Sequence, residues 1–311
     1  MKILVTGGAG FIGSHIVDAL VPHHTVHVLD DLSSGRVENV PSGATLHILD
    51  IRAPQVDALF ARERFEVLIH HAAQLDVRKS VADPAVDAEI NVIGFLNLME
   101  AGRRHGLQKV VFASTGGAIY GEPEYAGQDE AHPTRPISPY GIAKLAAEKY
   151  LHYYETQYGI QHVSLRYANV YGPRQSLTGE AGVVAIFIQR ILAGTVPIIY
   201  GDGTQTRDYT YVGDVVRANR AALDFPGSGV FNVGTDTETT VNDLFTLIRD
   251  RLAPGLEPTY GPSRPGEQMR SVLSYQKAAR ELGWTPQVNL EAGIAETVAW
   301  FQAHVSSPIS T

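Results

Sequence analysis

The sequence contains no cysteine among its 311 residues. This absence excludes disulfides, thiol nucleophiles and cysteine-based zinc sites. No apolar run approaches the roughly 18 residues of a membrane-spanning helix, and no signal peptide is visible after Met1. With 44% hydrophobic residues, the chain can bury a large core. We therefore expect a soluble globular protein located in the cytoplasm.

Positive charge is also scarce. The chain has 25 lysines and arginines against 33 aspartates and glutamates, a net charge of -8, and no block of like charges. This balance argues against a nucleic-acid surface or a polybasic membrane patch. A phosphorylated ligand would need arginines placed locally around it.

Short β-branched runs alternate with helix-length segments through the first hundred or so residues. We expect buried strands at residues 3–5, 26–29, 46–49, 67–69 and 110–113. This alternation is typical of a doubly wound parallel α/β sheet, the Rossmann type. The second half is richer in Gly, Pro and Thr, and we expect it to form a smaller mixed α/β substrate-binding domain.

A glycine turn follows the first expected strand, with Gly7, Gly10 and Gly13 spaced three apart. Such glycines allow a tight turn and a close approach of backbone N–H groups to a pyrophosphate, at the N-terminus of the next helix. Asp30 ends the second expected strand, where a carboxylate binds the adenosine ribose and repels a 2′-phosphate. The pattern predicts an NAD site, to which the neighbouring Asp31 adds charge.

Tyr140 and Lys144 lie one helical turn apart. Residues at this spacing share a helix face. An ammonium about 4 Å from a phenol, at an effective dielectric near 20, stabilises the phenolate by at most roughly 4 kcal/mol, or about three pKa units. Tyr140 could therefore act as a base near neutral pH.

Together, the glycine turn, Asp30 and the Tyr140–Lys144 pair resemble the extended short-chain dehydrogenase/reductases. Within that superfamily, the chain is most similar to the NAD-dependent nucleotide-sugar epimerases, in particular the UDP-glucose 4-epimerases. The resemblance implies a transient oxidation of the sugar at C4 by tightly bound NAD, with Tyr140 as the base. It also implies a hydroxyl from the segment after residue 113 that orients the sugar. Thr115 is the residue favoured by counting from the strand, Ser114 is the alternative, and counting back from Tyr120 reaches Gly116.

The same segment separates this chain from similar enzymes. The related 4,6-dehydratases place an Asp-Glu pair directly after the threonine, for the extra proton transfers of water elimination. Here these positions hold Gly116 and Gly117. Glu122 and Glu124 come later, where we expect an exposed loop.

The resemblance implies further cofactor contacts around the glycine turn and after the following strands. Asn91 is expected near the cofactor, in the helix-like stretch 85–106. The adjacent His70 and His71 are not expected to form a metal site, because neighbouring residues on a strand point apart. The expected cofactor-binding residues are Gly7, Gly10, Phe11, Ile12, Gly13, Asp30, Asp31, Asp50, Ile51, Ala72, Ala73, Gln74, Asn91, Ser114, Tyr140, Lys144 and Tyr167.

On the substrate side, the resemblance implies binding of a UDP-sugar in which arginines hold the diphosphate. The expected substrate-binding residues are Thr115, Tyr140, Asn169, Val183, Val184, Arg207, Arg264 and Glu267. Arginine suits a diphosphate because it donates two parallel hydrogen bonds. Ser271 is the position at which a small side chain would give room to an N-acetyl group.

The motifs predict an interleaved layout. The NAD-binding domain takes residues 1–168 and about 212–232, and the nucleotide-sugar domain takes about 169–211 and 233–311. The superfamily resemblance implies a homodimer formed by helices in 85–106 and 138–158. The expected activity is interconversion of UDP-glucose and UDP-galactose. The alternatives are an epimerase for UDP-N-acetylglucosamine or UDP-glucuronate, a net nucleotide-sugar oxidoreductase, and a non-catalytic NAD-binding protein.

Overall fold

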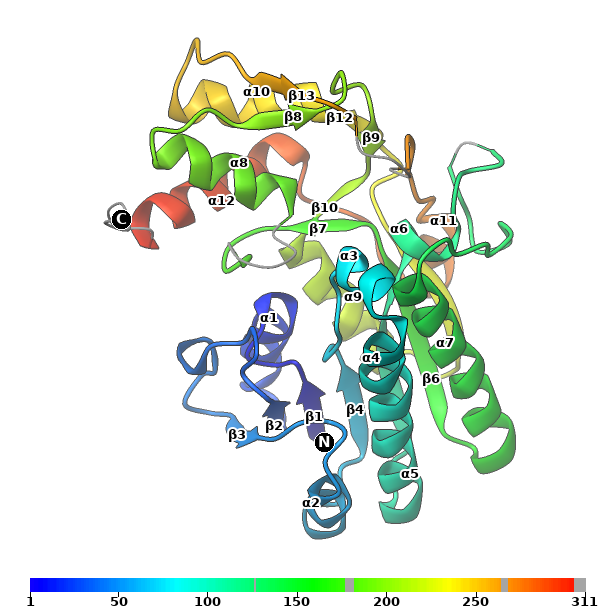
Figure 1. Cartoon of the computed structure of the whole chain (residues 1–311). Coiled ribbons are helices and arrows are strands. Elements are labelled where there is room, and N and C mark those ends of the chain that lie inside the picture. The colour runs from blue at the N-terminus through cyan, green and yellow to red at the C-terminus, as the bar shows by residue number, and fades with distance from the viewer. Residues whose placement is uncertain (126, 177–181, 264–267, 305–311) are drawn as a thin grey trace.

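The computed structural model describes residues 1–125, 127–176, 182–263 and 268–304 (Figure 1). A seven-stranded sheet forms the centre of its larger part. The strands lie in the order β11-β6-β5-β4-β1-β2-β3, and every neighbouring pair is parallel. They are β1 (Lys2–Thr6), β2 (Thr25–Asp30), β3 (Thr45–Ile48), β4 (Val67–His70), β5 (Lys109–Thr115), β6 (Gln161–Tyr167) and β11 (Gly229–Val233). The predicted parallel α/β sheet is confirmed.

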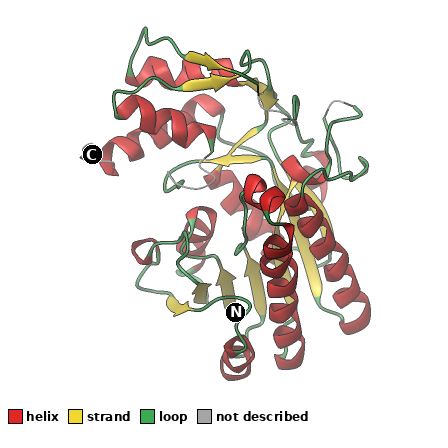
Figure 2. Cartoon of the chain, in the orientation of Figure 1, coloured by secondary structure: helices red, strands yellow, loops and turns green. Residues whose placement is uncertain are grey.

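Helices cover both faces of this sheet (Figure 2). Strand side chains alternate between the faces, so Ile3 and Val5 pack into one hydrophobic cluster while Leu4 packs into the other. The first cluster is covered by α1 (Phe11–Leu20), α9 (Val212–Asp224) and α11 (Gln276–Glu281). The second is covered by α2 (Gln55–Glu63), α5 (Phe95–His105) and α7 (Pro139–Tyr158).

The helix-like stretch predicted at residues 85–106 is one run of consecutive helical elements. It comprises α4 (Pro84–Ala88), the π-helix η2 (Glu89–Gly94) and α5, and it follows the short α3 (Val77–Ala82). A π-helical turn is rare and often marks a functional position. Here it contains Asn91.

A third hydrophobic cluster builds the smaller part of the molecule, which Figure 1 shows above the carboxyl ends of the sheet strands. It gathers side chains of α8 (Val183–Leu192), α10 (Val241–Leu252), α12 (Leu290–His304) and β8 (Ile198–Tyr200). Three two-stranded pairings complete the described part of the fold. They join β8 to β13 (Thr259–Gly261), β7 (Asn169–Tyr171) to β10 (Tyr209–Tyr211), and β9 (Thr206–Arg207) to β12 (Thr239–Thr240).

The two parts are interleaved along the chain. Ala278 and Trp284 pack into the first cluster, although they lie between segments that build the third. The domain boundaries drawn from the sequence stay a prediction. In the described ranges, none of the helices has the length and apolar character needed to cross a membrane.

Candidate active site

The turn between β1 and α1 is built for close approach of a ligand. Gly7 has φ +68°, and a Cβ there would lie 2.7 Å from the backbone nitrogen of Ala72. A Cβ at Gly13 would collide with the carbonyl oxygen of Gly7. α1 begins at Phe11, and no side chain caps its N-terminus. Its first backbone N–H groups and the bare turn therefore fit the pyrophosphate of a dinucleotide.

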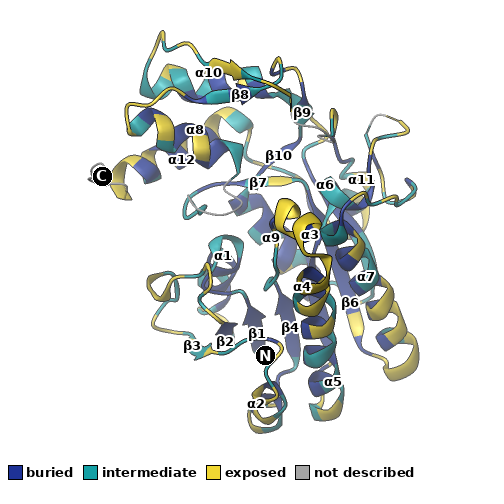
Figure 3. Cartoon of the chain, viewed as in Figure 1, coloured by how far each residue is buried: buried dark blue, intermediate teal, exposed yellow. Residues whose placement is uncertain are grey.

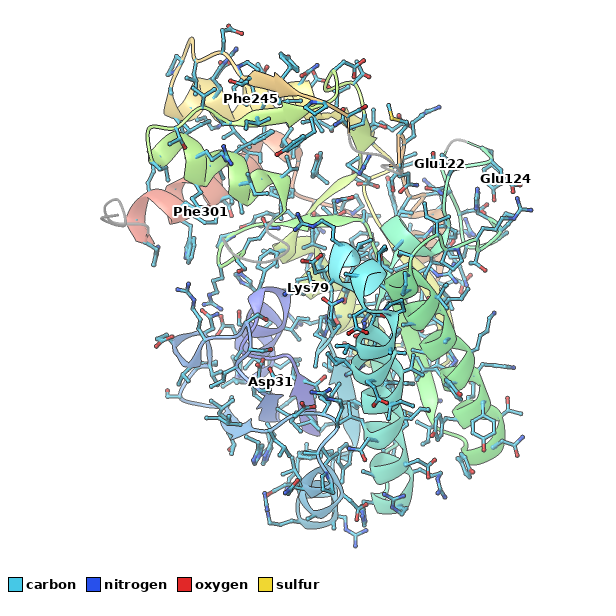
Figure 4. The ribbon with its side chains drawn as sticks, viewed as in Figure 1. Asp31, Lys79, Glu122, Glu124, Phe245 and Phe301 are labelled. Carbon is cyan, nitrogen blue, oxygen red and sulfur yellow. The ribbon has the colours of Figure 1, made fainter. Side chains whose placement is uncertain are left out.

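Asp30 is held at the end of β2 by backbone donors. Its Oδ2 accepts from the nitrogen of Ala9 at 3.0 Å, and its Oδ1 accepts from the nitrogen of Leu32 at 2.9 Å. Burial raises the pKa of Asp30, while these two hydrogen bonds oppose the rise. Asp31 is exposed and accepts from the nitrogen and hydroxyl of Ser33, as a turn residue does. Figure 4 labels Asp31 in the loop that follows β2.

The loops after β3 and β4 continue the expected cofactor side. Asp50 accepts hydrogen bonds from the guanidinium of Arg52, which lower the pKa of the Asp50 carboxyl. The next residue, Ile51, is buried. Gln74 and Asn91 are joined reciprocally. The nitrogen of Gln74 donates to Asn91 Oδ1 at 2.9 Å, and Asn91 Nδ2 donates to the carbonyl of Gln74 at 2.8 Å. Asn91 thus fixes the loop containing Ala72 to Gln74.

Ser114 and Thr115 end β5 and face different surroundings. Ser114 is buried, and its Oγ donates to Glu148 Oε1 at 2.6 Å. Glu148 is also paired with Arg166, whose NH2 group lies 2.7 Å from Oε2. Thr115 is half-buried and precedes α6 (Gly116–Ile119). Of the two hydroxyls, that of Thr115 is therefore the one not committed to the Glu148–Arg166 pair.

Gly116 cannot supply a third candidate side chain without rearrangement. A Cβ at Gly116 would collide with the side chain of Leu273, whereas a Cβ at Gly117 would lie 4.0 Å from Thr115 Oγ1. Gly116 therefore faces a covering leucine. The acidic residues that follow the threonine in a dehydratase have no counterpart here, and Glu122 and Glu124 are exposed on a loop (Figure 4).

Tyr140 and Lys144 lie in the first turns of α7, where Ser138 caps the helix by accepting from the nitrogen of Gly141. Lys144 is buried, and its Nζ donates to the carbonyl of Ala113 at 2.9 Å. The same Nζ lies 5.9 Å from the ring centroid of Tyr140. Burial lowers the pKa of Lys144 to about 8, so it is an ammonium at pH 7. The two residues lie on the same helix, α7, and their role as base and cation stays a prediction.

Tyr167 lies deeper than its expected role at the cofactor suggests. Its hydroxyl accepts from Asn219 Nδ2 at 2.8 Å and lies 3.1 Å from His71 Nε2. Burial raises the pKa of Tyr167 and lowers that of His71 to about 3. His71, the half-buried first residue after β4, and the buried Tyr167 are therefore both neutral at pH 7.

The expected substrate residues lie on or beside the smaller part. Asn169 is exposed at the start of β7, and Arg207 is half-buried in β9 with NH1 2.8 Å from the carbonyl of Thr206. Val183 is half-buried, but Val184 is 1% exposed inside the third cluster. Of the two valines, Val183 is the better placed to border a ligand. Arg264 and Glu267 lie outside the described residues.

Asp208 is a structural residue that the sequence analysis did not single out. Its carboxylate accepts from the nitrogen and hydroxyl of Thr235 and from the nitrogen of Leu273. It is fully buried, and burial raises its pKa to about 6. Asp208 therefore connects the segment of Arg207 to the leucine that covers Gly116. Its place directly after the expected substrate residue Arg207 was the available signal.

Among the residues with described positions, no group of three or more His, Asp or Glu side chains could hold a metal ion.

The comparisons with known proteins agree with the geometry. The model of the NAD dependent epimerase/dehydratase family matches residues 3–234. The chain belongs to this family.

Its relatives cover nearly its full length. The chain is 47% identical to the UDP-glucose 4-epimerase of Mycolicibacterium smegmatis, across 97% of this chain and 99% of the relative. A UDP-glucose 4-epimerase of Thermotoga maritima, solved with UDP-glucose, is 48% identical with a TM-score of 0.96, over 98% of this chain and 100% of that one. The Thermus thermophilus UDP-glucose 4-epimerase, solved with NAD, is 47% identical with a TM-score of 0.92, over the same shares.

Proposed function

We propose that this protein is a UDP-glucose 4-epimerase, interconverting UDP-glucose and UDP-galactose with a tightly bound NAD. The observation that carries the proposal is that α7, with Tyr140 and Lys144, packs against β5, which ends at Thr115, while Gly116 and Gly117 follow with no acid. These side chains suit one reversible removal of a hydroxyl proton. Water elimination would need further acids.

In this proposal, the buried Lys144 ammonium stabilises the phenolate of Tyr140, whose oxygen takes the proton of the sugar C4 hydroxyl. Thr115 orients that hydroxyl. NAD, when bound, supplies the redox chemistry at C4 and is regenerated by the return step. Asn169 and Arg207 hold the nucleotide diphosphate, so the oxidised hexose can turn between the two steps while its anchor stays in place.

The proposed NAD contacts come from the glycine turn, the N-terminus of α1 and Asp30. The bare glycine turn and the N-terminus of α1 would hold the pyrophosphate, and Asp30 would bind the adenosine ribose. Two carboxylates at Asp30 and Asp31 disfavour a 2′-phosphate. NAD is therefore preferred over NADP, which argues against the alternative of a net oxidoreductase using exchangeable NADPH.

The deciding experiment is incubation of the purified protein with UDP-galactose and no added cofactor, followed by NMR detection of UDP-glucose. Conversion is expected in the wild type and in the Tyr158→Phe control, which changes an exposed tyrosine at the far end of α7. Tyr140→Phe should abolish turnover while NAD still co-purifies. No conversion of any nucleotide hexose, or an active Tyr140→Phe variant, would refute the proposal.

The preference for the sugar C2 substituent is a finer part of the proposal. Ser271 is small and 2% exposed, in a segment where the carbonyl of Met269 accepts from the nitrogen of Thr206. We expect a small residue here to admit UDP-N-acetylglucosamine alongside UDP-glucose. Turnover of both sugars supports this, whereas turnover of UDP-glucose alone contradicts it. Activity on UDP-glucuronate instead would favour the uronate epimerase alternative.

We also propose a homodimer, formed through one face of the α4–η2 run and α7. Large apolar side chains are exposed along these helices, and Figure 3 shows exposed surface on both. They are Val86, Ile93, Ile142, Tyr150 and Tyr153. Sedimentation should give twice the mass of one chain, and Tyr153→Glu should shift it to the monomer mass. A wild-type monomer would contradict the proposal. A cytoplasmic location stays a prediction.

A further inference from the structure

α4 carries a buried carboxylate that has no cationic partner in direct contact among the described residues. Asp87 is 1% exposed, and its Oδ1 accepts from Gln74 Nε2 and Asn91 Nδ2, each at 3.0 Å. Its Oδ2 is buried and accepts no hydrogen bond from the described residues. Burying an unpaired carboxylate is costly, so a position that keeps one calls for a compensating positive charge.

Lys144 is the buried cation of the neighbouring helix. Its ammonium can donate three hydrogen bonds, and the carbonyl of Ala113 accepts one of them. It also lies 4.8 Å from the ring centroid of Phe112. Across the described parts of the chain, no carboxylate forms a direct salt bridge with it. A buried lysine of this kind loses its proton easily unless a negative charge lies near.

The charges around Lys144 single out Asp87. α4 and η2 both pack against α7, so the helix that carries Asp87 lies beside the helix that carries Lys144. Burial lowers the pKa of Lys144, and Asp87 opposes that effect. Burial likewise raises the pKa of Asp87, and its hydrogen bonds and the charge of Lys144 oppose that rise. His70 ends β4 and His71 follows it, and burial holds the pKa values of both far below 7, so neither adds a positive charge beside Lys144 at neutral pH. Tyr140, on the same helix, is a further titratable neighbour of Lys144.

We propose that Asp87 is the counter-charge of Lys144, a positioning residue that keeps this side chain an ammonium ion and so keeps Tyr140 able to ionise. The effect of Asp87 on catalysis rests on the proposed function, whereas its electrostatic interaction with Lys144 does not depend on that function. The same carboxylate binds Gln74 and Asn91, so it also joins the charge of the base to the loop expected at the cofactor.

The Asp87→Asn variant separates the negative charge of Asp87 from its hydrogen bonds to Gln74 and Asn91. The amide oxygen can replace Oδ1 as the acceptor for Gln74 and Asn91, and the amide nitrogen can occupy the place of Oδ2, where no protein donor among the described residues would oppose it. The variant thus removes the charge and keeps the hydrogen bonds. Glu89→Gln is the matched control, because it removes the same charge at an exposed position two residues along the same helical run.

The first readout is the titration of Lys144, followed by NMR of proteins carrying 13C-labelled lysine and assigned by the signal lost in Lys144→Met. Loss of a nearby negative charge destabilises the ammonium. We therefore expect the pKa of Lys144 to fall from about 8 by about one unit in Asp87→Asn and to stay unchanged in Glu89→Gln. An unchanged titration in Asp87→Asn would overturn the proposal.

The second readout is the pH profile of kcat/KM. Its alkaline limb should move to lower pH by the same amount in Asp87→Asn, whereas a merely structural role would lower activity equally at every pH. If Asp87→Asn does not fold, the reciprocal measurement replaces it: the pKa of Asp87 should rise in Lys144→Met, and a constant value would overturn the proposal. A protein inactive on all nucleotide sugars would refute the proposed function, while both NMR titrations would still decide this inference.

Discussion

Ser114 Oγ donates a 2.6 Å hydrogen bond to Glu148 Oε1, inside the buried ion pair of Glu148 and Arg166. The next hydroxyl along β5, that of Thr115, belongs to a half-buried residue at the start of α6. The two adjacent hydroxyls therefore have different tasks. Ser114 satisfies a buried carboxylate, and Thr115 is the candidate for orienting the sugar.

This difference gives the first prediction. Thr115→Val should lower kcat by about 10²-fold or more and leave thermal stability nearly unchanged, because it removes a hydroxyl expected to act at the sugar. Ser114→Ala should keep most of the kcat but lower the free energy of unfolding by about 1–3 kcal/mol, since Glu148 loses a buried donor. Kinetics with UDP-galactose and urea unfolding check both. The reverse pattern would assign the sugar contact to Ser114.

The sequence favoured Thr115 over Ser114 for the sugar contact, but it did not show which groups surround the Ser114 hydroxyl. Successive residues on a strand face opposite sides, so one hydroxyl had to point away from the other. Which one meets the ligand depends on Glu148 and Arg166, which come from α7 and β6 and are far from β5 in the chain. In contrast, the glycine turn, Asp30 and the Tyr140–Lys144 pair are local patterns with a fixed spacing, and the sequence was sufficient to find them.

The buried position of Asp87 also could not be predicted from the sequence. The helical stretch around it was predictable, and Asn91 four residues later was identified through the family resemblance. The burial of Asp87, however, follows from the packing of α4 and η2 against α7. A single acidic residue in an otherwise exposed helix carries no sequence signal for such a position, because acidic residues on helices are mostly solvated.

The second prediction concerns Gly116, where counting back from Tyr120 would place the sugar-orienting hydroxyl. Gly116→Ser should lower the free energy of unfolding by about 1–3 kcal/mol, because the new Cβ would collide with Leu273. It should not restore turnover to Thr115→Val. In the Leu273→Ala background, the same substitution should cost clearly less, which a double-mutant cycle would measure. Rescue of Thr115→Val by Gly116→Ser would instead place the active hydroxyl at this position.

The third prediction concerns the ion pair of Glu148 and Arg166, whose side chains are 4% and 6% exposed. Arg166→Met should lower the free energy of unfolding by about 3–5 kcal/mol, because it leaves the carboxylate of Glu148 buried and uncompensated. Adding Glu148→Gln should recover part of that loss. Urea denaturation of the two single variants and the double variant provides the test. Additive losses would show that the two charges do not interact.

The fourth prediction follows from Asp208, whose pKa burial raises from the ordinary 3.8 to about 6. Between these values the folded protein binds a proton that the unfolded chain releases, so this group makes the protein less stable as the pH rises through the window. The shift corresponds to a loss of roughly 1–3 kcal/mol between about pH 4 and 6.5.

Asp208→Asn removes that titration. The amide oxygen can accept from the hydroxyl of Thr235 or from the nitrogen of Leu273 but not from both, so the variant should fold with a lower free energy of unfolding at every pH. Its deficit relative to the wild type should shrink by roughly 1–3 kcal/mol from about pH 4 to 6.5, because only the wild type incurs the cost of ionising Asp208. The control is Asp236→Asn. Asp236 is an exposed aspartate two residues from Gly234, and asparagine tolerates its φ of +57°. Urea unfolding at both pH values measures the difference for each variant. A deficit that is constant with pH in Asp208→Asn would mean that Asp208 is ionised throughout the range, with its hydrogen bonds outweighing its burial.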